Sequence, residues 1–239
     1  MLEVRKVSKS FRGLRAVREA SFEVPEGSIN ALIGPNGAGK TTIFNTIAGV
    51  YAPDSGKIVF QNREIQGLRP DQVCAAGIGR TFQIVKPFAG LSVLDNVMVG
   101  AFLRERTAAG ARAHALSILK TLQLDGKAHH PAASLTLPER KRLEVARALA
   151  TRPRILLLDE VMAGLRPTET DQMVRVFREI NRADGLTILL IEHVMRAVMA
   201  LAQHIGVLHH GEVIARGKPE EVVRNAAVLE CYLGEDTEV

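Results

Sequence analysis

A glycine-rich stretch after a short apolar run has the spacing of a loop that binds phosphate. Residues 34–42 read Gly-Pro-Asn-Gly-Ala-Gly-Lys-Thr-Thr and follow the apolar run 29–33. Glycines permit tight turns that leave backbone amides pointing at an anion, and a helix beginning near Lys40 adds the positive end of its dipole. Lys40 brings a full charge to the outer phosphates, and the hydroxyl of Thr41 suits Mg²⁺. The predicted nucleotide-binding residues are Gly34, Pro35, Asn36, Gly37, Ala38, Gly39, Lys40, Thr41 and Thr42.

Two carboxylates close an apolar run later in the chain. Residues 155–158 are all aliphatic, which is typical of a fully buried parallel strand, and Asp159 and Glu160 follow directly. The carboxyl end of such a strand is where an open α/β sheet places its ligands. Asp159 therefore fits Mg²⁺, and Glu160 fits a base that acts on a water molecule beside the γ-phosphate. The alternative is a strand that meets solvent at an Asp-Glu turn, and the phosphate loop upstream favours the functional interpretation.

Three further residues carry weaker signals. Glu192 and His193 close the apolar run 186–191, and His193 is expected at the same sheet edge as Asp159, where an imidazole can contact phosphate. Gln83 ends an apolar stretch and, taken alone, is a surface residue. Phe11 is expected in a loop before the phosphate loop, where it either stacks on a nucleotide base or belongs to the core.

Periodicity and turn residues predict the elements that carry these groups. Strands are expected at 2–7, 20–24, 57–60, 155–158 and 186–191, with a hairpin at 203–215 that turns at Gly211. Helices are expected at 42–50, 70–76, 91–103, 108–122, 138–150, 168–182 and 219–233, followed by a frayed acidic tail at 234–239. A run of helices interrupts the alternation of strand and helix, which predicts an inserted helical subdomain at 87–151.

Composition excludes several classes of protein. The 239 residues are 4% aromatic with no Trp, so the core must be aliphatic. The net charge of +5 is scattered between apolar residues, which favours a solvated surface over a nucleic-acid patch. Cys74 and Cys231 have no partner spacing, so neither a disulfide framework nor a metal site is implied. No apolar stretch has the ~18 residues of a membrane helix, and residues 1–6 are not a signal peptide.

The order of these motifs resembles that of the ATP-binding-cassette ATPases, from Leu2 to about Leu233. Gly34–Thr42 is similar to the Walker A loop, 155–159 to Walker B, Arg80-Thr-Phe-Gln83 to the Q-loop, and His193 to the switch histidine. The stretch 76–83, Ala-Gly-Ile-Gly-Arg-Thr-Phe-Gln, resembles in particular the importers of branched-chain amino acids and related amides. The resemblance implies an α/β P-loop NTPase with a RecA-like core and a mixed sheet at 1–86 and 152–218. An antiparallel β subdomain, the helical subdomain at 87–151 and a C-terminal helix and tail at 219–239 complete this one domain.

The resemblance also implies roles for residues whose own signals are ambiguous. Glu160 becomes the catalytic glutamate, Gln83 senses Mg²⁺ and the attacking water, His193 steadies the γ-phosphate, and Phe11 stacks on adenine. ATP and Mg²⁺ are the implied cofactors, with Thr41, Gln83 and Asp159 around the metal. The implied partners are a second cassette that closes head to tail on two ATP molecules, membrane permease subunits, and a periplasmic or extracellular substrate-binding protein. The implied location is the cytoplasmic face of the cell membrane.

The signature sequence departs from the family pattern. Leu-Ser-Gly-Gly-Gln aligns with Leu135, Thr136, Leu137, Pro138 and Glu139. Pro138 has no backbone N–H to offer phosphate, and Glu139 adds a negative charge that Arg140 and Lys141 could offset. Because this signature acts on the partner's nucleotide, we expect a heterodimer with a second cassette.

Two interpretations other than transport stay open: an ATPase outside transport, and a nucleotide-binding regulator that scarcely hydrolyses ATP.

Two further departures from the family pattern follow the catalytic glutamate in the sequence. Arg166 replaces the acidic or amide residue usual in the family's D-loop, and Val161 stands where proline is common after the glutamate.

Overall fold

The computed structural model describes residues 1–83 and 86–233, and its amino-terminal strands form an antiparallel sheet in the order β2-β1-β4-β5. These strands are β1 (Leu2–Phe11), β2 (Leu14–Val24), β4 (Ser55–Phe60) and β5 (Arg63–Glu64). The prediction that Phe11 lies in a loop is wrong, because Phe11 ends β1 and pairs with Leu14. Arg12 and Gly13 both have positive φ, at 47° and 90°, and turns of this kind join strands in register after only two residues.

A six-stranded mixed sheet forms the centre of the molecule, in the order β10-β9-β3-β8-β7-β6. Its strands are β3 (Ile29–Ile33), β6 (Ile78–Arg80), β7 (Ile155–Asp159), β8 (Thr187–Ile191), β9 (His204–His209) and β10 (Glu212–Gly217). All neighbours pair in parallel except β9 and β10, which form the predicted hairpin with Gly211 at its turn. Every residue of β3, β7 and β8 is buried, which explains their continuous apolar sequences.

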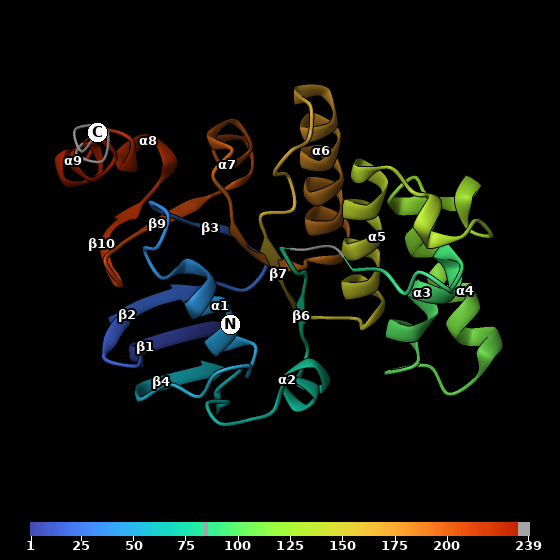
Figure 1. Cartoon of the computed structure of the whole chain (residues 1–239), viewed down its shortest axis with the longest axis horizontal. Helices are drawn as coiled ribbons and strands as arrows, with labels where there is room; N and C mark the ends of the chain where they lie inside the picture. The colour runs from blue at the N-terminus through green and yellow to red at the C-terminus, as the bar shows by residue number, and fades with distance from the viewer. Residues whose placement is uncertain (84–85, 234–239) are drawn as a thin grey trace.

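Alternate residues of the central strands face two different hydrophobic layers. On β7, Ile155 and Leu157 pack in one layer with α1 (Lys40–Ile47) and the antiparallel sheet. Leu156 and Leu158 pack in the other layer with α6 (Pro167–Asp184) and α7 (Met195–Leu201). Figure 1 shows the central sheet between these two layers. Sequence analysis missed α7, since this seven-residue helix buries only Ala197, Val198 and Leu201.

Three helices, α3 (Val93–Ala101), α4 (Ala108–Thr121) and α5 (Leu137–Ala150), lie together beside the central sheet and are called the helical subdomain here (Figure 1). Their apolar residues join the same core layer as Leu156 and Leu158. Thr136 is the residue before the first turn of α5, and Leu143 and Ala146 are fully buried. The helices fall inside the predicted segment 87–151, whose division from the rest of the chain stays a prediction.

The end of the described chain forms two helices instead of the single helix predicted at 219–233. They are α8 (Pro219–Val222) and α9 (Ala226–Leu233). Asn225 lies between them, and its side-chain Oδ1 accepts a hydrogen bond of 3.0 Å from the N–H of Ala227. An Asn side chain that binds the following backbone starts a new helix, so the first helix stops before it. The predicted acidic tail at 234–239 lies outside the described residues.

Candidate functional site

Two glycines of the phosphate loop, Gly34 and Gly39, occupy positions that no other residue fits. Gly34 and Gly39 have φ values of 147° and 101°. A Cβ on Gly34 would lie 2.0 Å from the carbonyl oxygen of Leu208, and one on Gly39 would lie 2.3 Å from that of Ala16. The loop is therefore wedged against β9 on one side and β2 on the other. This packing fixes the start of α1, whose first residue is Lys40.

The loop wraps around the ammonium group of Lys40. The Nζ atom donates hydrogen bonds to the carbonyl oxygens of Gly34 at 2.5 Å and Pro35 at 2.7 Å, and the residue is only 8% exposed. A cavity of about 230 Å³, called the phosphate cavity here, lies against the loop. Its lining residues are Ala16, Asn36, Gly37, Ala38, Gly39, Lys40, Thr41, Thr42, Gln83 and Glu160. The structure thus brings the loop together with Gln83 and Glu160, which the sequence separates by 77 residues.

The residues predicted to surround Mg²⁺ line a second, adjoining cavity. This side cavity has a volume of about 480 Å³ and includes Thr41, Gln83 and Asp159 among its lining residues. The side chain of Asp159 is 1% exposed, and its Oδ2 accepts a bond of 3.1 Å from the guanidinium of Arg80. Its Oδ1 is buried and has no hydrogen-bond partner among the described residues. A hard oxygen ligand with an unused lone pair beside a hydroxyl and an amide fits Mg²⁺.

Burial controls the ionisation of Asp159. Loss of hydration raises the pKa of this carboxyl above its ordinary value of 3.8, and the Arg80 guanidinium acts in the opposite direction without fully offsetting it. A divalent cation would favour the ionised form in the same way as Arg80 does. Sequence analysis missed Arg80, although it lies three residues before Gln83, because a cation in a short strand gives no sign that it will be buried.

Glu160 lies where the phosphate cavity meets the end of β8. Its Oε2 accepts a hydrogen bond of 2.7 Å from the side-chain amide of Gln83, and its Oε1 lies 3.9 Å from Nδ1 of His193. The backbone N–H of Glu160 donates to the carbonyl of Ile191 at 2.9 Å, which holds the ends of β7 and β8 together. The side chain of His193 is 60% exposed. The structure thus places His193 at the sheet edge of Asp159 and Glu160, and it places Gln83 there too, which its own sequence signal did not indicate.

Phe11 stands apart from the phosphate loop. The ring is 37% exposed and meets Tyr51 edge to face, with 5.0 Å between the ring centroids. Nζ of Lys9 lies 5.6 Å from the same ring. Phe11 does not line the phosphate cavity. A role with the base of a nucleotide therefore stays a prediction for this residue.

Within the altered signature, the Glu139 carboxylate already has hydrogen-bond and ion-pair partners in this chain. Oε2 of Glu139 accepts hydrogen bonds of 2.9 Å from both the backbone N–H and the hydroxyl of Thr136, and Oε1 pairs with Nζ of Lys127 at 2.6 Å. Partial burial acts to raise the pKa of Glu139, but Lys127 and Thr136 outweigh it and leave the pKa lowered. The expectation that Arg140 and Lys141 offset this charge is wrong. Arg140 donates to the carbonyls of Leu135 and Ala133, and Lys141 is buried elsewhere.

Two buried charged residues near the site were not recognised from the sequence. Lys141 is 6% exposed, and its Nζ donates to the main-chain carbonyl of Glu160 at 2.9 Å. Glu192 is 1% exposed, and its Oε1 accepts a bond of 2.8 Å from the N–H of Met162. Desolvation raises the pKa of Glu192 to about 7. Lys141 stands in a run of charged residues and Glu192 follows an apolar strand at its end, so neither position signalled burial of the charge.

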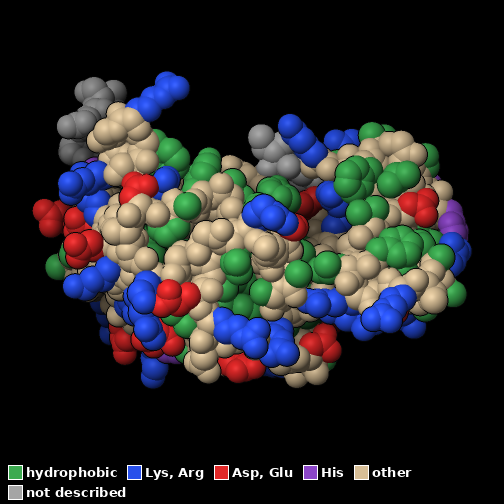
Figure 2. All heavy atoms as spheres, turned by 90° about the horizontal axis from the view of Figure 1, so that it is seen from below, with side chains coloured by type: hydrophobic (Ala, Val, Ile, Leu, Met, Phe, Trp, Pro, Cys, Tyr) green, Lys and Arg blue, Asp and Glu red, His purple; other side chains and the backbone are tan. Residues whose placement is uncertain are grey.

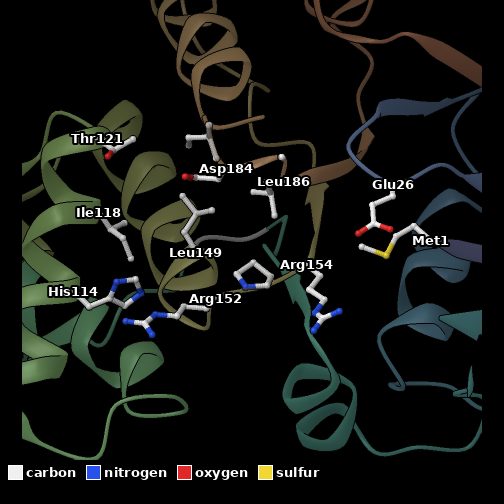
Figure 3. Close-up of a pocket in the computed structure, with 13 residues that line it drawn as sticks. Met1, Glu26, His114, Ile118, Thr121, Leu149, Arg152, Arg154, Asp184 and Leu186 are labelled. Atoms are coloured by element: carbon white, nitrogen blue, oxygen red, sulfur yellow. The ribbon is translucent and has the colours of Figure 1, made fainter. Parts of the chain in front are cut away.

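A cavity of about 490 Å³ lies at the other ends of the central strands. Its lining includes Arg154 and Leu186, which immediately precede β7 and β8, and none of residues 34–42. Figure 3 shows His114 of α4 and Arg152 lying close to each other at one end of this cavity. Burial and the charge of Arg152 lower the pKa of His114. The cavity is therefore separate from the phosphate loop, which follows the carboxyl end of β3.

Comparison with known proteins places this geometry in a family. A family model described as "ABC transporter" matches residues 17–163, and one described as "Branched-chain amino acid ATP-binding cassette transporter" matches residues 212–238. The high-affinity branched-chain amino acid transport ATP-binding protein BraF of Pseudomonas aeruginosa is 39% identical, with 98% of each chain covered. LivG of Salmonella typhimurium, which has the same description, is 38% identical, also with 98% of each chain covered.

Solved structures have the same fold. The ADP conformation of MJ1267, an ATP-binding cassette of an ABC transporter, superimposes with a TM-score of 0.88 at 29% identity and covers 98% of both chains. A dimeric post-hydrolysis state of the cassette MJ0796, bound to ADP and Pi, superimposes with a TM-score of 0.84 at 26% identity. That match covers 92% of this chain and 99% of the other. The chain therefore belongs to the ABC transporter family, as an ATP-binding and ATP-hydrolysing subunit of the branched-chain amino acid transport type.

Proposed function

We propose that this chain cleaves ATP at the phosphate cavity with Glu160 as the base and drives import of branched-chain amino acids or related amides. The observation that carries the proposal is the meeting of Gln83, Glu160 and the phosphate loop around one cavity of about 230 Å³. A carboxylate held by an amide at 2.7 Å is fixed in orientation. It can accept a proton from a water molecule placed in line with the γ-phosphate.

The test of this assignment is Glu160→Gln. We expect the variant to lose ATP turnover by roughly 100-fold or more and to retain bound ATP, because the amide cannot accept the proton. Glu179→Gln is the matched control, since Glu179 is exposed on α6 far along the chain from the site. Turnover by Glu160→Gln equal to that of the parent would instead favour a regulatory subunit that scarcely hydrolyses ATP.

Mg²⁺ would be held by Thr41, Asp159 and Gln83. The unpartnered Oδ1 of buried Asp159 supports this set, as does the position of all three residues around the side cavity. Bound Mg²⁺ supplies positive charge that stabilises the developing charge on the phosphates. Without the metal, Arg80 orients the Asp159 carboxylate and favours its ionised form. Titration of the nucleotide-free chain with Mg²⁺ should show weaker binding by Asp159→Asn than by the parent.

His193 and Phe11 would contact the two ends of the nucleotide. His193 lies 3.9 Å from Glu160 and is exposed, so its imidazole can reach the γ-phosphate and the attacking water. The exposed ring of Phe11 would stack on adenine, outside the phosphate cavity. Phe11→Ala should therefore weaken the binding of ATP but leave the binding of inorganic triphosphate unchanged. Equal loss for both ligands would refute the adenine contact.

The dimer would be a heterodimer with a second cassette. Dimeric cassettes occur among the structural relatives, as in MJ0796. In this chain Glu139 already occupies the Thr136 N–H and hydroxyl, and Pro138 offers no N–H, so the start of α5 has little left for a partner's phosphate. Sedimentation of Glu160→Gln with ATP should give a dimer only after the partner cassette is added. A stable homodimer with full turnover would refute this proposal.

The membrane partner would dock between Gln83 and the helical subdomain. The side cavity continues into a groove of about 190 Å³ that reaches Val99 and Gly100 of α3. Exposed apolar side chains surround this region, namely Phe82, Phe88, Val99, Phe102 and Leu103. Figure 2 shows hydrophobic side chains gathered on the half of the molecule that contains the helical subdomain. Among the residues that the structure describes, no helix could span a bilayer.

A peripheral position on the cytoplasmic face of the cell membrane follows from this docking, with permease subunits and a substrate-binding protein completing the importer. ATP hydrolysis by the assembled transporter, measured with and without the loaded binding protein, tests the arrangement. Stimulation by a loaded branched-chain amino acid receptor would support the proposed cargo. An ATPase outside transport would show no such dependence.

A further inference from the structure

Two buried charges beside the site have no part in the chemistry described so far. Lys141 lies on α5, five residues after Thr136, and Glu192 lies directly after β8. Their residues are 6% and 1% exposed. Charged residues are seldom buried this completely unless they are paired or hydrogen-bonded, because dehydration is costly. The hydrogen bonds of Lys141 and Glu192 therefore indicate the role of the two residues.

Both side chains bind the main chain of the segment that leaves β7. Nζ of Lys141 donates to the carbonyl oxygen of Glu160 at 2.9 Å. Oε1 of Glu192 accepts from the N–H of Met162 at 2.8 Å. The N–H of Glu160 donates to the carbonyl of Ile191, also at 2.9 Å. Three hydrogen bonds, one to α5 and two to the end of β8, thus hold residues 160–162.

The conformation of Glu160 explains why such fixing is needed. Its φ is +50°, in the left-handed region that costs a residue with a side chain roughly 1–2 kcal/mol. Such a conformation persists only when surrounding contacts determine it. The same backbone conformation sets the direction of the Glu160 carboxylate, which points at Gln83. Loss of the contacts at residues 160–162 would let Glu160 relax and its carboxylate turn away.

Lys141 and Glu192 also interact with each other through their opposite charges. Burial lowers the pKa of Lys141, whereas the charges of Glu192, Glu160, Asp159 and Glu144 act to raise it. The second oxygen of Glu192 has no hydrogen-bond partner among the described residues. Besides the hydrogen bond from Met162, a nearby positive charge favours the ionised form of Glu192. Lys141 supplies that charge from a helix of the helical subdomain.

We propose that Lys141 and Glu192 are positioning residues that clamp residues 160–162 and make the geometry of Glu160 depend on the placement of α5. This inference rests on the proposed role of Glu160 as the base. The same helix carries the signature residues at its start, and Glu144 and Arg147 on the groove proposed for the membrane partner. A shift of α5 against the central sheet would break the bond from Lys141. The helix would then slow cleavage without touching the nucleotide.

The experiment measures kcat and KM for ATP in the assembled transporter carrying Lys141→Met, Lys141→Arg or Arg142→Met. We expect Lys141→Met to lower kcat by roughly 10- to 100-fold, as misplaced catalytic groups do, with KM for ATP nearly unchanged. Lys141→Arg keeps a donor and should restore most of kcat. Arg142→Met is the matched control, because the neighbouring Arg142 binds Gln123 and Gln172 and not residues 160–162.

Glu192 is tested by the same assay. Glu192→Gln keeps an oxygen that can accept from Met162 and should retain most of kcat, whereas Glu192→Leu should lower it as Lys141→Met does. The clamp is refuted if Lys141→Met turns over ATP as fast as Arg142→Met, if its loss appears in KM, or if Lys141→Arg is as slow as Lys141→Met. Glu160→Gln distinguishes failure of the clamp from failure of the proposed role of Glu160. If it abolishes turnover while Lys141→Met has no effect, only the clamp fails, and if it has no effect itself, the role of Glu160 fails.

Discussion

Arg80→Met should destabilise the nucleotide-free protein far more than removal of an exposed ion pair. The side chains of Arg80 and Asp159 are 9% and 1% exposed, and their closest N–O distance is 3.1 Å. Arg80 also donates to Oδ1 of Asn45 at 2.7 Å. Removal of one partner from a buried pair typically costs about 3–5 kcal/mol, because the other charge stays buried alone.

Protonation sets an upper limit on that loss. Keeping a carboxyl with an ordinary pKa of 3.8 neutral at pH 7 costs about 4 kcal/mol, and no larger electrostatic loss can persist because Asp159 would then bind a proton. We therefore expect the free energy of unfolding to fall by about 3–4 kcal/mol at pH 7. At pH 5 the same limit is about 2 kcal/mol, so the electrostatic part of the loss should shrink as the pH falls.

Urea denaturation of the chain in magnesium-free buffer at pH 7 and pH 5 measures both values. Arg69→Met is the control, since the Arg69–Asp71 pair is exposed on both sides and should contribute at most ~1 kcal/mol. Addition of Mg²⁺ should stabilise Arg80→Met more than the parent, because the ion would compensate the charge that Arg80 no longer does. A loss below ~1 kcal/mol at pH 7, or one that is the same at pH 5, would refute this account of Asp159.

Three further changes test the loop, the buried carboxyl and the core. Gly39→Ala should lower the free energy of unfolding by roughly 3 kcal/mol, because its Cβ would lie 2.3 Å from the carbonyl of Ala16, whereas Gly37→Ala meets nothing within 4 Å and should cost about 1 kcal/mol. Urea denaturation of the two variants decides this, and equal losses would contradict it. The pKa of Glu192 is raised to about 7 in the folded protein. The folded protein therefore becomes less stable as the pH rises from about 4.5 to 7, because the buried carboxyl must then ionise. Glu192→Gln should therefore gain about 3 kcal/mol relative to the parent between pH 4.5 and pH 8, and a pH-independent difference would argue against a buried carboxyl. Phe177→Ala should cost roughly 3–5 kcal/mol in thermal or chemical unfolding, since this ring is 0% exposed in the core, and a loss below ~1 kcal/mol would mean that the site collapses around the deletion.

Local sequence was sufficient to identify the parts of this protein that depend on neighbouring residues. The phosphate loop, the strands 29–33 and 155–159 and the helix with Pro138 in its first turn each carry their signal within about fifteen residues. Glycines at positions that exclude a Cβ, and aliphatic runs that must be buried on both faces, are written directly in residue type. Element ends were less certain, as in the early end expected for β1, the missed helix α7 and the break at Asn225.

Only the tertiary structure decided which polar residues work together. The side chain of Gln83 is hydrogen-bonded to Glu160, and Arg80 forms an ion pair with Asp159. Glu139 pairs with Lys127 and not with Arg140. In each case the two partners come from different segments of the chain. A charged residue in a sequence gives no indication of its burial, because burial depends on which strand or helix lies opposite. The sequence by itself therefore determined where the phosphate loop lies and predicted which residues would bind a nucleotide's phosphates. The packing of α5 and β8 against the end of β7 decided how the carboxylates at that site are held.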